Sequence, residues 1–579
     1  MFWDMHLEDP ETATGAVASL VSDSRLVPSI VSICRYFAAD STKSGTDYDR
    51  ITGPLSSDGP RGGDLNDRFP WFNYMAPDES RIELDGSDVK QRHAEAASVV
   101  PSPARMYVGG EWVGAESGDT FETRDPTTGE VLATVPAGDA SDVDRAVAAA
   151  TEAYENRWSD ANAADRQEVL DAIADRIEDN QEELATLETL DNGKSLADAR
   201  IDMGDAAAQF RYFAGATRSL EGKALPHEDG RIAHTLREPY GVVGGIVPWN
   251  FPLSMAAYKL APAVAAGNCM VLKPAEQTPL TTVRLAELVD DVVPDGVINL
   301  VTGYGPDAGE PLVEHPDVHK LAFTGSTEVG REVMRTAADH LAAVTLELGG
   351  KNPVIIYPDT DLEEAAEVAT MSIFPNAGQS CSAGSRVFVH SDAASEFLDA
   401  FEATTRELVV GDPLVEETDI GPQITADEAE STLTHIAEAE SAGARIRIGG
   451  GRPEDPVLSD RPYVLPTIVE GIDHDHSAVQ EEIFGPVVEI FEWDDYDEMI
   501  ALANDVEYGL AAGVLTQDID QAYRTADDLK AGFIWVNQYH DYPFGLPYGG
   551  YKQSGVGRER AAETMNHYTR TKSIDVSID

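Results

Sequence analysis

Short apolar segments alternate with longer helical segments through most of this chain, and this alternation constrains the fold more than any other feature. The expected strands are the apolar runs at residues 241–247, 269–273, 297–301, 320–323 and 344–346. Residues 253–266 and 279–293, which lie between such runs, have the pattern of helices. Strands separated by helices form a parallel sheet that is covered on both faces. The sequence therefore predicts an α/β fold, with a second α/β series at residues 352–536.

Two local patterns predict further elements. Ser141 stands three residues before Asp144 at the start of an alanine-rich amphipathic run, which is typical of a capping-box helix start. Residues 225–238 interrupt the first series with turn formers and polar alternation, which favours a protruding hairpin.

Residues 1–105 differ from the rest of the chain. Gly, Ser, Asp and Pro crowd residues 41–67, and no sustained period is visible there. These residues are either a flexible extension or sequence that precedes the true start at Met75, and we favour the second interpretation.

The charge of the chain is extreme. There are 103 Asp and Glu residues against 42 Lys and Arg residues, which gives a net charge of −61. The acidic residues are scattered in short runs, and salt would screen their mutual repulsion. We therefore predict a protein from a halophilic cytoplasm. Phosphate contacts need clustered basic side chains, so the same charge excludes nucleic acid as a partner.

The cysteines and the apolar runs bear on the cellular compartment. Three cysteines in 579 residues are too few for a disulfide framework, and they fit a reducing compartment. No apolar run has the length that crosses a membrane, and the N-terminus is acidic where a signal peptide would be basic. We predict a cytoplasmic protein without a membrane partner.

One of these cysteines, Cys381, is a candidate nucleophile. It lies among small and polar residues at positions 376–386, which leave its sulfur approachable. Cys269 lies in an apolar run and fits the ordinary case of a buried, inert thiol. A reactive thiol needs a base or a positive field nearby. Glu347, at the end of an apolar strand, is a candidate base, although alone it could be a surface residue.

Two further segments could bind a reacting oxygen or a phosphate. Asn250 follows the strand at residues 241–247, and ligands gather beyond the carboxyl ends of parallel strands. Its amide group could hold an oxyanion. Residues 323–330 form a strand, a Gly-Ser turn and a helix start, which is a suitable cradle for a pyrophosphate.

Together these segments resemble the aldehyde dehydrogenase superfamily over residues 106–575. The resemblance rests on the order and spacing of seven motifs, at residues 248–252, 273–279, 323–330, 347–351, 379–381, 482–486 and 549–555. It implies that Cys381 attacks the aldehyde carbonyl, while Asn250 and the backbone N–H of Cys381 hold the oxyanion. It also implies that Glu347 activates the hydrolytic water, and that Lys259 and Glu559 relay the proton. For these last two an ordinary ion pair is the alternative.

The resemblance also implies a nicotinamide cofactor. The residues that match cofactor-binding positions are Trp249, Lys273, Glu276, Gly325, Ser326, Gly330, Glu482 and Phe484. Glu276 puts a carboxylate where a 2′-phosphate would have to lie, so NAD is expected rather than NADP. Relatives that transfer the acyl group to coenzyme A lack a carboxylate at the position of Glu347, so hydrolysis to the free acid is expected. No metal is expected, and residues 473–476 are interpreted as a solvated acidic loop.

The partner implied is a small aldehyde whose identity stays open. Relatives that act on dicarboxylic semialdehydes carry an arginine where Tyr258 stands, which argues against succinic semialdehyde. The residues that match or neighbour substrate-pocket positions are aromatic: Phe251, Tyr258, Phe374, Tyr539 and Tyr548. They could form a general apolar slot, or a cage that holds the trimethylammonium group of betaine aldehyde by cation–π attraction.

The resemblance implies a division into domains. A Rossmann-like NAD-binding domain is expected at residues 106–220 and 240–348, and a catalytic domain at residues 349–560. Residues 221–239 and 566–579 are expected to join subunits in a homodimer or homotetramer. Two competing hypotheses are a catalytically silent homologue and a thiol esterase, but a dedicated esterase would not need the cofactor residues.

Overall fold

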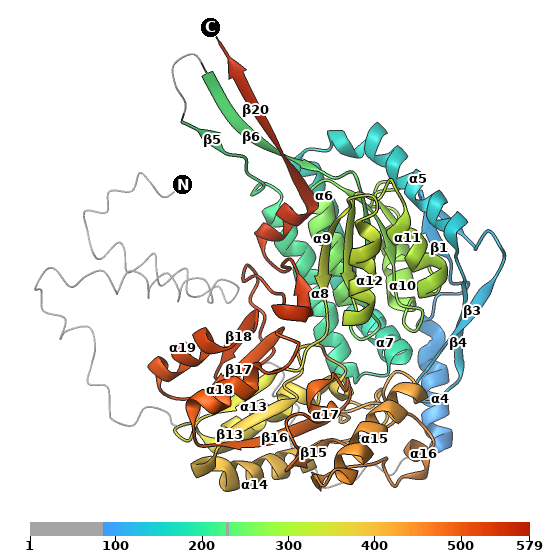
Figure 1. Ribbon diagram of the computed structural model, residues 1–579. Coiled ribbons are helices and arrows are strands. Elements are labelled where there is room, and N and C mark those ends of the chain that lie inside the picture. Colours follow the sequence, from blue (N-terminus) through green and yellow to red (C-terminus); the bar gives the residue numbers. More distant parts are fainter. Residues whose placement is uncertain (1–84, 227–230, 579) are drawn as a thin grey trace, which may run out of the picture. The chain divides into compact units, whose positions relative to one another are not determined.

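The structure is a computed structural model, and it describes residues 85–226 and 231–578. Cys34 and Met75 lie outside these residues, so the nature of residues 1–84 stays a prediction. The described residues form two α/β halves, each built around its own sheet (Figure 1).

The first half contains an eight-stranded sheet with the order β19-β11-β10-β7-β8-β9-β1-β2. Its five central strands are parallel: β7 (Val242–Ile246), β8 (Cys269–Lys273), β9 (Ile298–Leu300), β10 (Lys320–Thr324) and β11 (Ala343–Glu347). They confirm the five strands predicted from the apolar runs. At one edge, β1 (Met106–Val108) and β2 (Glu111–Val113) continue the sheet in antiparallel pairs.

Helices cover this sheet. They are α5 (Ala140–Asn156), α6 (Ala163–Asp179), α7 (Gln181–Asn192), α8 (Leu196–Ala216), α9 (Pro252–Ala265), α10 (Leu280–Val289), α11 (Glu310–Glu314) and α12 (Thr327–Ala337). The prediction of a helix at residues 253–266 is confirmed by α9, which has Pro252 at its first position, where a missing N–H is harmless.

Two predicted helix ends were wrong. The N-cap of α5 is Asp139, not Ser141, because the Asp139 carboxylate accepts the Ser141 N–H at 2.8 Å and Asp142 completes the capping box. Helix α10 ends at Val289, four residues before the predicted end. Asp290 and Asp291 follow it, and negative charge is unfavourable at a helix C-terminus.

The second half contains a seven-stranded sheet with the order β14-β15-β16-β13-β12-β17-β18. Its strands are β12 (Pro353–Ile356), β13 (Arg386–His390), β14 (Arg445–Ile448), β15 (Thr467–Glu470), β16 (Val487–Trp493), β17 (Ala511–Leu515) and β18 (Phe533–Val536). Only β14 is antiparallel to its neighbour. This sheet confirms the second α/β series.

Both faces of this second sheet are buried. Val354 and Ile356 pack in one apolar cluster with α13 (Leu362–Ile373) and α14 (Ser391–Glu407). Ile355, between them, packs in another cluster with α18 (Tyr496–Asn504). Successive side chains of a strand point to opposite faces, which explains the continuous apolar run.

The boundary between the halves is not simple in sequence. Residues 349–560 were assigned to the catalytic domain, yet β19 (Gly555–Val556) pairs with Leu346 and Glu347 of β11. The Leu348 N–H also donates to the Ser554 carbonyl at 2.9 Å. The chain returns because the edge of β11 has backbone groups that need partners.

Part of the expected N-terminal extension is folded. Helix α4 (Gly86–Ala96) lies within residues 1–105, and its His93 is buried. His93 Nδ1 lies 2.6 Å from Asp125 Oδ2, and Nε2 lies 2.8 Å from Asp412 Oδ1. The folded chain thus begins at least twenty residues before position 106. The sequence did not indicate this contact, because Asp125 and Asp412 lie 32 and 319 positions away from His93 in the chain.

A three-stranded sheet projects from the first half (Figure 1). Strand β6 (Arg231–Pro239) lies between β5 (Ala224–Leu225) and the C-terminal strand β20 (Thr569–Ser577). It contains the hairpin that was predicted at residues 225–238.

Candidate active site

Cys381 lies in a loop between helix α13 and strand β13. The loop begins with a turn at Pro375–Gly378, in which Asn376 and Ala377 have φ angles of 50° and 53°. The Asn352 amide then binds the Cys381 carbonyl at 2.9 Å. Cys381 is partly exposed, in contrast to Cys269, which is fully buried in β8.

The surroundings of Cys381 keep its thiol protonated. Burial, and then the carboxyl groups of Glu482 and Glu347, raise the pKa of the Cys381 thiol to about 12. The hydroxyl of Tyr548 and the backbone N–H of Cys381 itself act in the opposite direction and lower this pKa. These two groups therefore stabilise negative charge on the sulfur.

Asn250 lies beyond the end of β7 and contacts the cysteine loop directly. The side-chain Nδ2 of Asn250 donates to the backbone carbonyl of Gln379 at 2.9 Å. The backbone carbonyl of Asn250 accepts from Asn376 Nδ2 at 2.8 Å. An amide group has two N–H donors, so one remains for a reacting oxygen. The two halves of the protein meet at these bonds.

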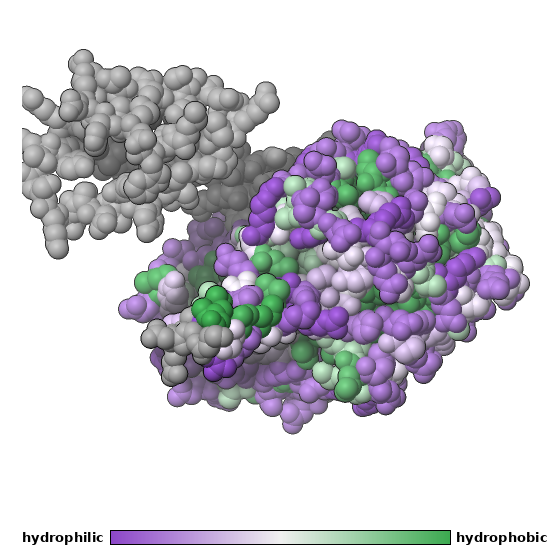
Figure 2. Space-filling view, turned by 90° about the horizontal axis from the view of Figure 1, so that it is seen from above, coloured by the Kyte–Doolittle hydropathy of each residue, from purple (hydrophilic) through white to green (hydrophobic). Residues whose placement is uncertain are grey.

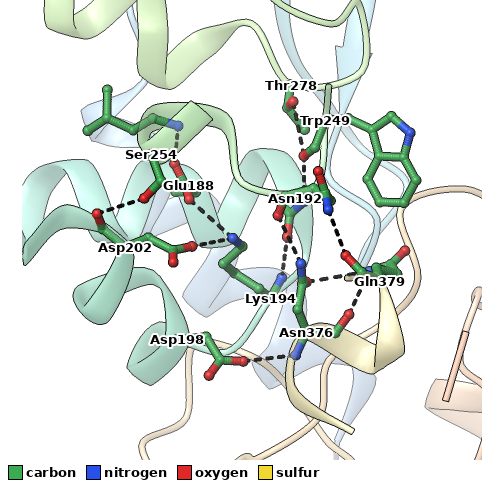
Figure 3. A network of polar contacts seen from close by, with 12 residues as sticks. Glu188, Asn192, Lys194, Asp198, Asp202, Trp249, Ser254, Thr278, Asn376 and Gln379 are labelled. Carbon is green, nitrogen blue, oxygen red and sulfur yellow. Dashed lines mark hydrogen bonds and ion pairs between the residues drawn. The ribbon is translucent and has the colours of Figure 1, made fainter. Parts of the chain in front are cut away.

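A buried polar network supports this contact (Figure 3). Asp198 accepts from the Asn376 N–H at 3.1 Å, which holds the strained turn before Cys381. Asn192 Nδ2 donates to the carbonyl of Trp249, the neighbour of Asn250, at 2.9 Å. The network therefore fixes both sides of the Asn250–Gln379 contact.

Three charged groups, linked to one another by dashed lines, lie on one side of the network (Figure 3). Lys194 is buried between Asp202 and Glu188, and its Nζ lies 3.3 Å from Glu188 Oε1. Glu188 in turn accepts from the Leu253 N–H at 3.2 Å. Desolvation raises the pKa of Asp202 to about 8, in spite of Lys194. These residues could not be recognised in the sequence, since charged residues on a helical pattern normally indicate a solvated face.

Glu347 ends strand β11 and is buried. Neither carboxyl oxygen has a hydrogen-bond partner among the described residues. Burial, followed by the nearby Glu559 carboxylate, raises the pKa of Glu347 well above its usual range. An unpartnered buried carboxyl group is costly, and such groups are often functional.

Lys259 and Glu559 form a buried ion pair, which lies close enough to Glu347 to influence its pKa. Lys259 belongs to α9, and Glu559 lies in the segment after β19. The Glu559 backbone pairs with Tyr548 through hydrogen bonds of 2.7 and 3.0 Å. The two residues predicted to relay the proton are therefore adjacent. The same contact also fits the alternative interpretation, in which Lys259 and Glu559 form an ordinary ion pair.

The residues predicted to bind the adenosine ribose lie at the end of β8. Lys273 Nζ donates to the Pro274 carbonyl at 3.0 Å and to Glu276 Oε2 at 3.3 Å. Burial lowers the pKa of Lys273, with Glu276 opposing the shift. The Glu276 side chain is partly exposed and can accept hydrogen bonds from a ligand.

Glu482, Phe484 and Trp249 form a second group. Glu482 Oε1 accepts from the Gly350 N–H at 3.0 Å, and burial raises the pKa of Glu482 to about 7. A Cβ atom on Gly349 would lie 2.1 Å from Glu482 Oε2, so only glycine fits there. The rings of Trp249 and Phe484 meet edge to face at 5.3 Å.

The predicted phosphate cradle opens helix α12. Ser326 is the exposed N-cap, and its Oγ accepts from the Val329 N–H at 3.3 Å. The Gly325 N–H donates to the Glu347 carbonyl at 3.1 Å, which links the cradle to strand β11. Gly330 packs against Leu348, where a Cβ atom would lie 2.4 Å from Cδ2.

Only some of the aromatic residues predicted to line the pocket contact the cysteine loop. Tyr539 donates to the Ser382 carbonyl at 2.9 Å, and Tyr548 is the neighbour that influences the Cys381 thiol. Phe374 directly follows helix α13, is buried in the apolar core and stacks on Phe401, and its place in the pocket stays a prediction. Tyr542, which was missed, bonds Ser382 Oγ at 2.8 Å.

The other two aromatic residues lie against positive charges. Lys194 Nζ is 4.3 Å from the centre of the Phe251 ring. The Arg560 guanidinium is 4.9 Å from the centre of the Tyr258 ring. Arg560 was also missed by the sequence analysis, although it directly follows Glu559.

The sequence predicts neither a metal site nor a membrane-spanning segment, and the described residues bear on both predictions. His474, Asp475 and Asp505 bring ligand atoms within 4.8 Å of one another, but both carboxylates are exposed, and the solvated loop stays a prediction. Among the helices in residues 85–226 and 231–578, none is both long and apolar enough to cross a membrane.

Comparisons with known proteins identify the fold and the family. The model of the Aldehyde dehydrogenase family matches residues 112–574. An aldehyde dehydrogenase from Bacillus cereus, solved with NAD+, is 42% identical over 86% of this chain and 100% of its own, with a TM-score of 0.82. A betaine aldehyde dehydrogenase from Staphylococcus aureus, also solved with NAD+, is 39% identical over 85% of this chain and 98% of its own, with a TM-score of 0.82. The chain belongs to the aldehyde dehydrogenase family and is an enzyme of that class.

Proposed function

We propose that this enzyme oxidises an aldehyde to the carboxylic acid with NAD, through a thioester on Cys381. The observation that supports this most is the Asn250–Gln379 hydrogen bond, at 2.9 Å, which brings an amide donor to the loop of a partly exposed cysteine. Glu347, buried without a partner among the described residues, influences the same thiol.

NAD fits the residues around strands β8 and β11. The N-terminus of α12, with exposed Ser326, can hold a phosphate group. Glu276 and Lys273 would hold the adenosine ribose, and Glu482 with Phe484 the nicotinamide ribose and ring. When bound, NAD supplies the hydride acceptor. The Glu276 carboxylate would repel a 2′-phosphate, so NAD is preferred to NADP.

The first step is attack of the Cys381 sulfur on the aldehyde carbon. The thiol gives up its proton to solvent, and the new C–S bond forms as the carbonyl π bond breaks, which gives a thiohemiacetal whose oxyanion is held by the free N–H of Asn250. Transfer of the hydrogen on carbon, as hydride, to a bound NAD would convert this adduct into a thioester. The N–H of Cys381, which stabilises charge on the sulfur, would also face this oxygen.

The second step is hydrolysis of the thioester. Glu347 takes one proton from water as its oxygen attacks the thioester carbon, and the C–S bond breaks while the second water proton passes to the sulfur, which releases the carboxylate and the Cys381 thiol. Lys259 and Glu559, next to Glu347, would pass that proton toward solvent. Ester hydrolysis by Cys381 is a side activity in this scheme.

The test separates the two steps. Cys381→Ser should abolish NADH formation from aldehydes. Glu347→Gln should still form one NADH per site in a burst, because hydride transfer precedes hydrolysis, and should lower steady-state turnover on the order of 10²–10⁴-fold. A Glu347→Gln enzyme with full steady-state turnover would contradict the role of Glu347. NAD-independent ester hydrolysis without any NADH formation would favour the esterase alternative.

We also propose that the projecting sheet joins subunits in a homodimer or homotetramer. It exposes large apolar side chains, at residues Leu225, Ile232, Leu236, Val576 and Ile578. Figure 2 looks down on this end of the protein and shows hydrophobic surface there. Exposed apolar groups of this kind mark contact surfaces. Light scattering should give a dimer or tetramer, and Ile232→Asp with Leu236→Asp should give monomer.

A further inference from the structure

The Arg560 guanidinium lies against three aromatic rings, one of which, Tyr258, belongs to the proposed aldehyde pocket. The centre of its guanidinium group lies 4.9 Å from the Tyr258 ring, 5.3 Å from the Tyr542 ring and 4.6 Å from the Phe544 ring. These distances are within the range of cation–π attraction. The guanidinium of Arg560 therefore already lies against three aromatic rings that could otherwise bind a cationic ligand.

These rings are tied to the reacting cysteine. Tyr258 lies one residue before Lys259 in helix α9. The Tyr542 hydroxyl lies 2.8 Å from Ser382 Oγ, and Ser382 directly follows Cys381. The Tyr542 ring also meets the Tyr548 ring at 5.3 Å, and Tyr548 influences the Cys381 thiol. The guanidinium is thus two aromatic rings away from the sulfur.

Arg560 is fixed in this position by other groups. Its Nη1 atom donates to Asp205 Oδ1 at 2.9 Å, and its Nη2 atom donates to the Tyr542 carbonyl at 2.8 Å. The side chain is only 3% exposed, and its Nε atom has no partner among the described residues. The φ angle of Arg560 is 67°, which is unusual for a residue with a side chain. Such a buried, held group does not swing away for a ligand.

We propose that Arg560 is a specificity-determining residue, which takes the cation site of the aromatic pocket and makes the enzyme selective for uncharged aldehydes. The inference rests on the proposed function, because it assumes that the aldehyde approaches Cys381 past these rings. A trimethylammonium group would lose the aromatic faces and would meet a like charge at short range. Asp205 balances the charge of Arg560, so an anionic aldehyde gains no net attraction.

The experiment compares kcat/KM for betaine aldehyde with that for its neutral isostere 3,3-dimethylbutanal. The wild-type enzyme should prefer the neutral aldehyde by at least tenfold. Arg560→Gln combined with Asp205→Asn removes both charges and should shift the ratio toward betaine aldehyde by at least tenfold. Arg560→Lys keeps the cation and should keep the preference. The control is Arg176→Gln, which removes an arginine paired with Asp291 at 2.7 Å on the surface and should leave the ratio unchanged.

Binding of tetramethylammonium, measured by calorimetry, tests the inference without turnover. We expect binding by the double variant at least tenfold tighter than by the wild type. The proposal is overturned if the wild type prefers betaine aldehyde, or if neither the kinetic ratio nor the tetramethylammonium affinity of the double variant changes by more than twofold. If no aldehyde yields NADH, the proposed function fails, and the calorimetric result alone decides the role of Arg560.

Discussion

The amide of Asn250 donates to the carbonyl of Gln379 at 2.9 Å, across the two halves of the protein. Asn250→Ala should remove both this bond and the proposed oxyanion donor, and should lower kcat on the order of 10²–10³-fold. Asn299→Ala is the control, since Asn299 is also buried and bonds the Gly296 carbonyl at 2.8 Å. Both variants should have a lower melting temperature than the wild type, but only Asn250→Ala should have a strongly reduced kcat. Equal kcat losses would reduce Asn250 to a structural role.

The reactivity of Cys381 should rise steeply with pH. Its pKa of about 12 means that only the small thiolate fraction reacts, and this fraction grows about tenfold per pH unit below the pKa. Alkylation by iodoacetamide, followed by loss of activity, should therefore accelerate about tenfold per unit between pH 7 and pH 9. A rate that is flat over this range would contradict the assignment.

Tyr548→Phe should slow that alkylation at a given pH, because the Tyr548 hydroxyl lowers the Cys381 pKa. The matched control is Tyr357→Phe, since the Tyr357 hydroxyl is buried against Thr525 Oγ1 at 2.7 Å. It removes a comparable hydrogen bond and should leave the alkylation rate unchanged.

The buried pairing of His93 with Asp125 and Asp412 should make the stability of the fold depend on pH. Hydrogen bonds and attraction from Asp125 and Asp412 outweigh desolvation and raise the pKa of His93 from 6.5 to about 9. A raised pKa stabilises the fold fully below pH 6.5, and this stabilisation is lost as the pH rises through 9. The loss is at most about 3 kcal/mol. Urea titrations at pH 6.5 and 9.5 should show it, and His93→Gln should reduce the difference between them.

The net charge of −61 should make the protein depend on salt. Screening weakens the repulsion among carboxylates that folding brings together. The melting temperature should therefore rise as KCl is raised to molar concentrations, and sucrose at equal osmolality should not reproduce the whole effect. A melting temperature that falls or stays constant in KCl would count against adaptation to salt.

The sequence predicted what depends on local pattern. Strand β8 matches its apolar run residue for residue, because a strand buried on both faces must be apolar throughout. The structure also brings Cys381, Glu347 and Asn250 together, as the order of their motifs suggested. The segments of Asn250 and Glu347 lie at the carboxyl ends of β7 and β11, which both pair with β10 in one parallel sheet, whereas Cys381 reaches them from the loop before β13.

The sequence could not predict contacts between remote polar residues. Arg560 and Asp205 are 355 positions apart, and neither belongs to a recognisable pattern. The structural role of His93 was missed for the same reason, since this role depends on hydrogen bonds to two carboxylates that are distant in the chain. The early end of α10 was accessible in principle, because Asp290 and Asp291 oppose a helix C-terminus.

The last residues of the chain complete structures that began hundreds of residues earlier. Strand β20 pairs with β6 from Thr569↔Pro239 to Ser577↔Arg231, and β19 closes the edge of β11. A nascent chain can therefore form most of its first half early, but must keep two strand edges open until β19 and β20 have been synthesised. Open edges can pair with another chain. Loss of the final eleven residues should thus cause aggregation during synthesis, even though it leaves every proposed catalytic residue in place.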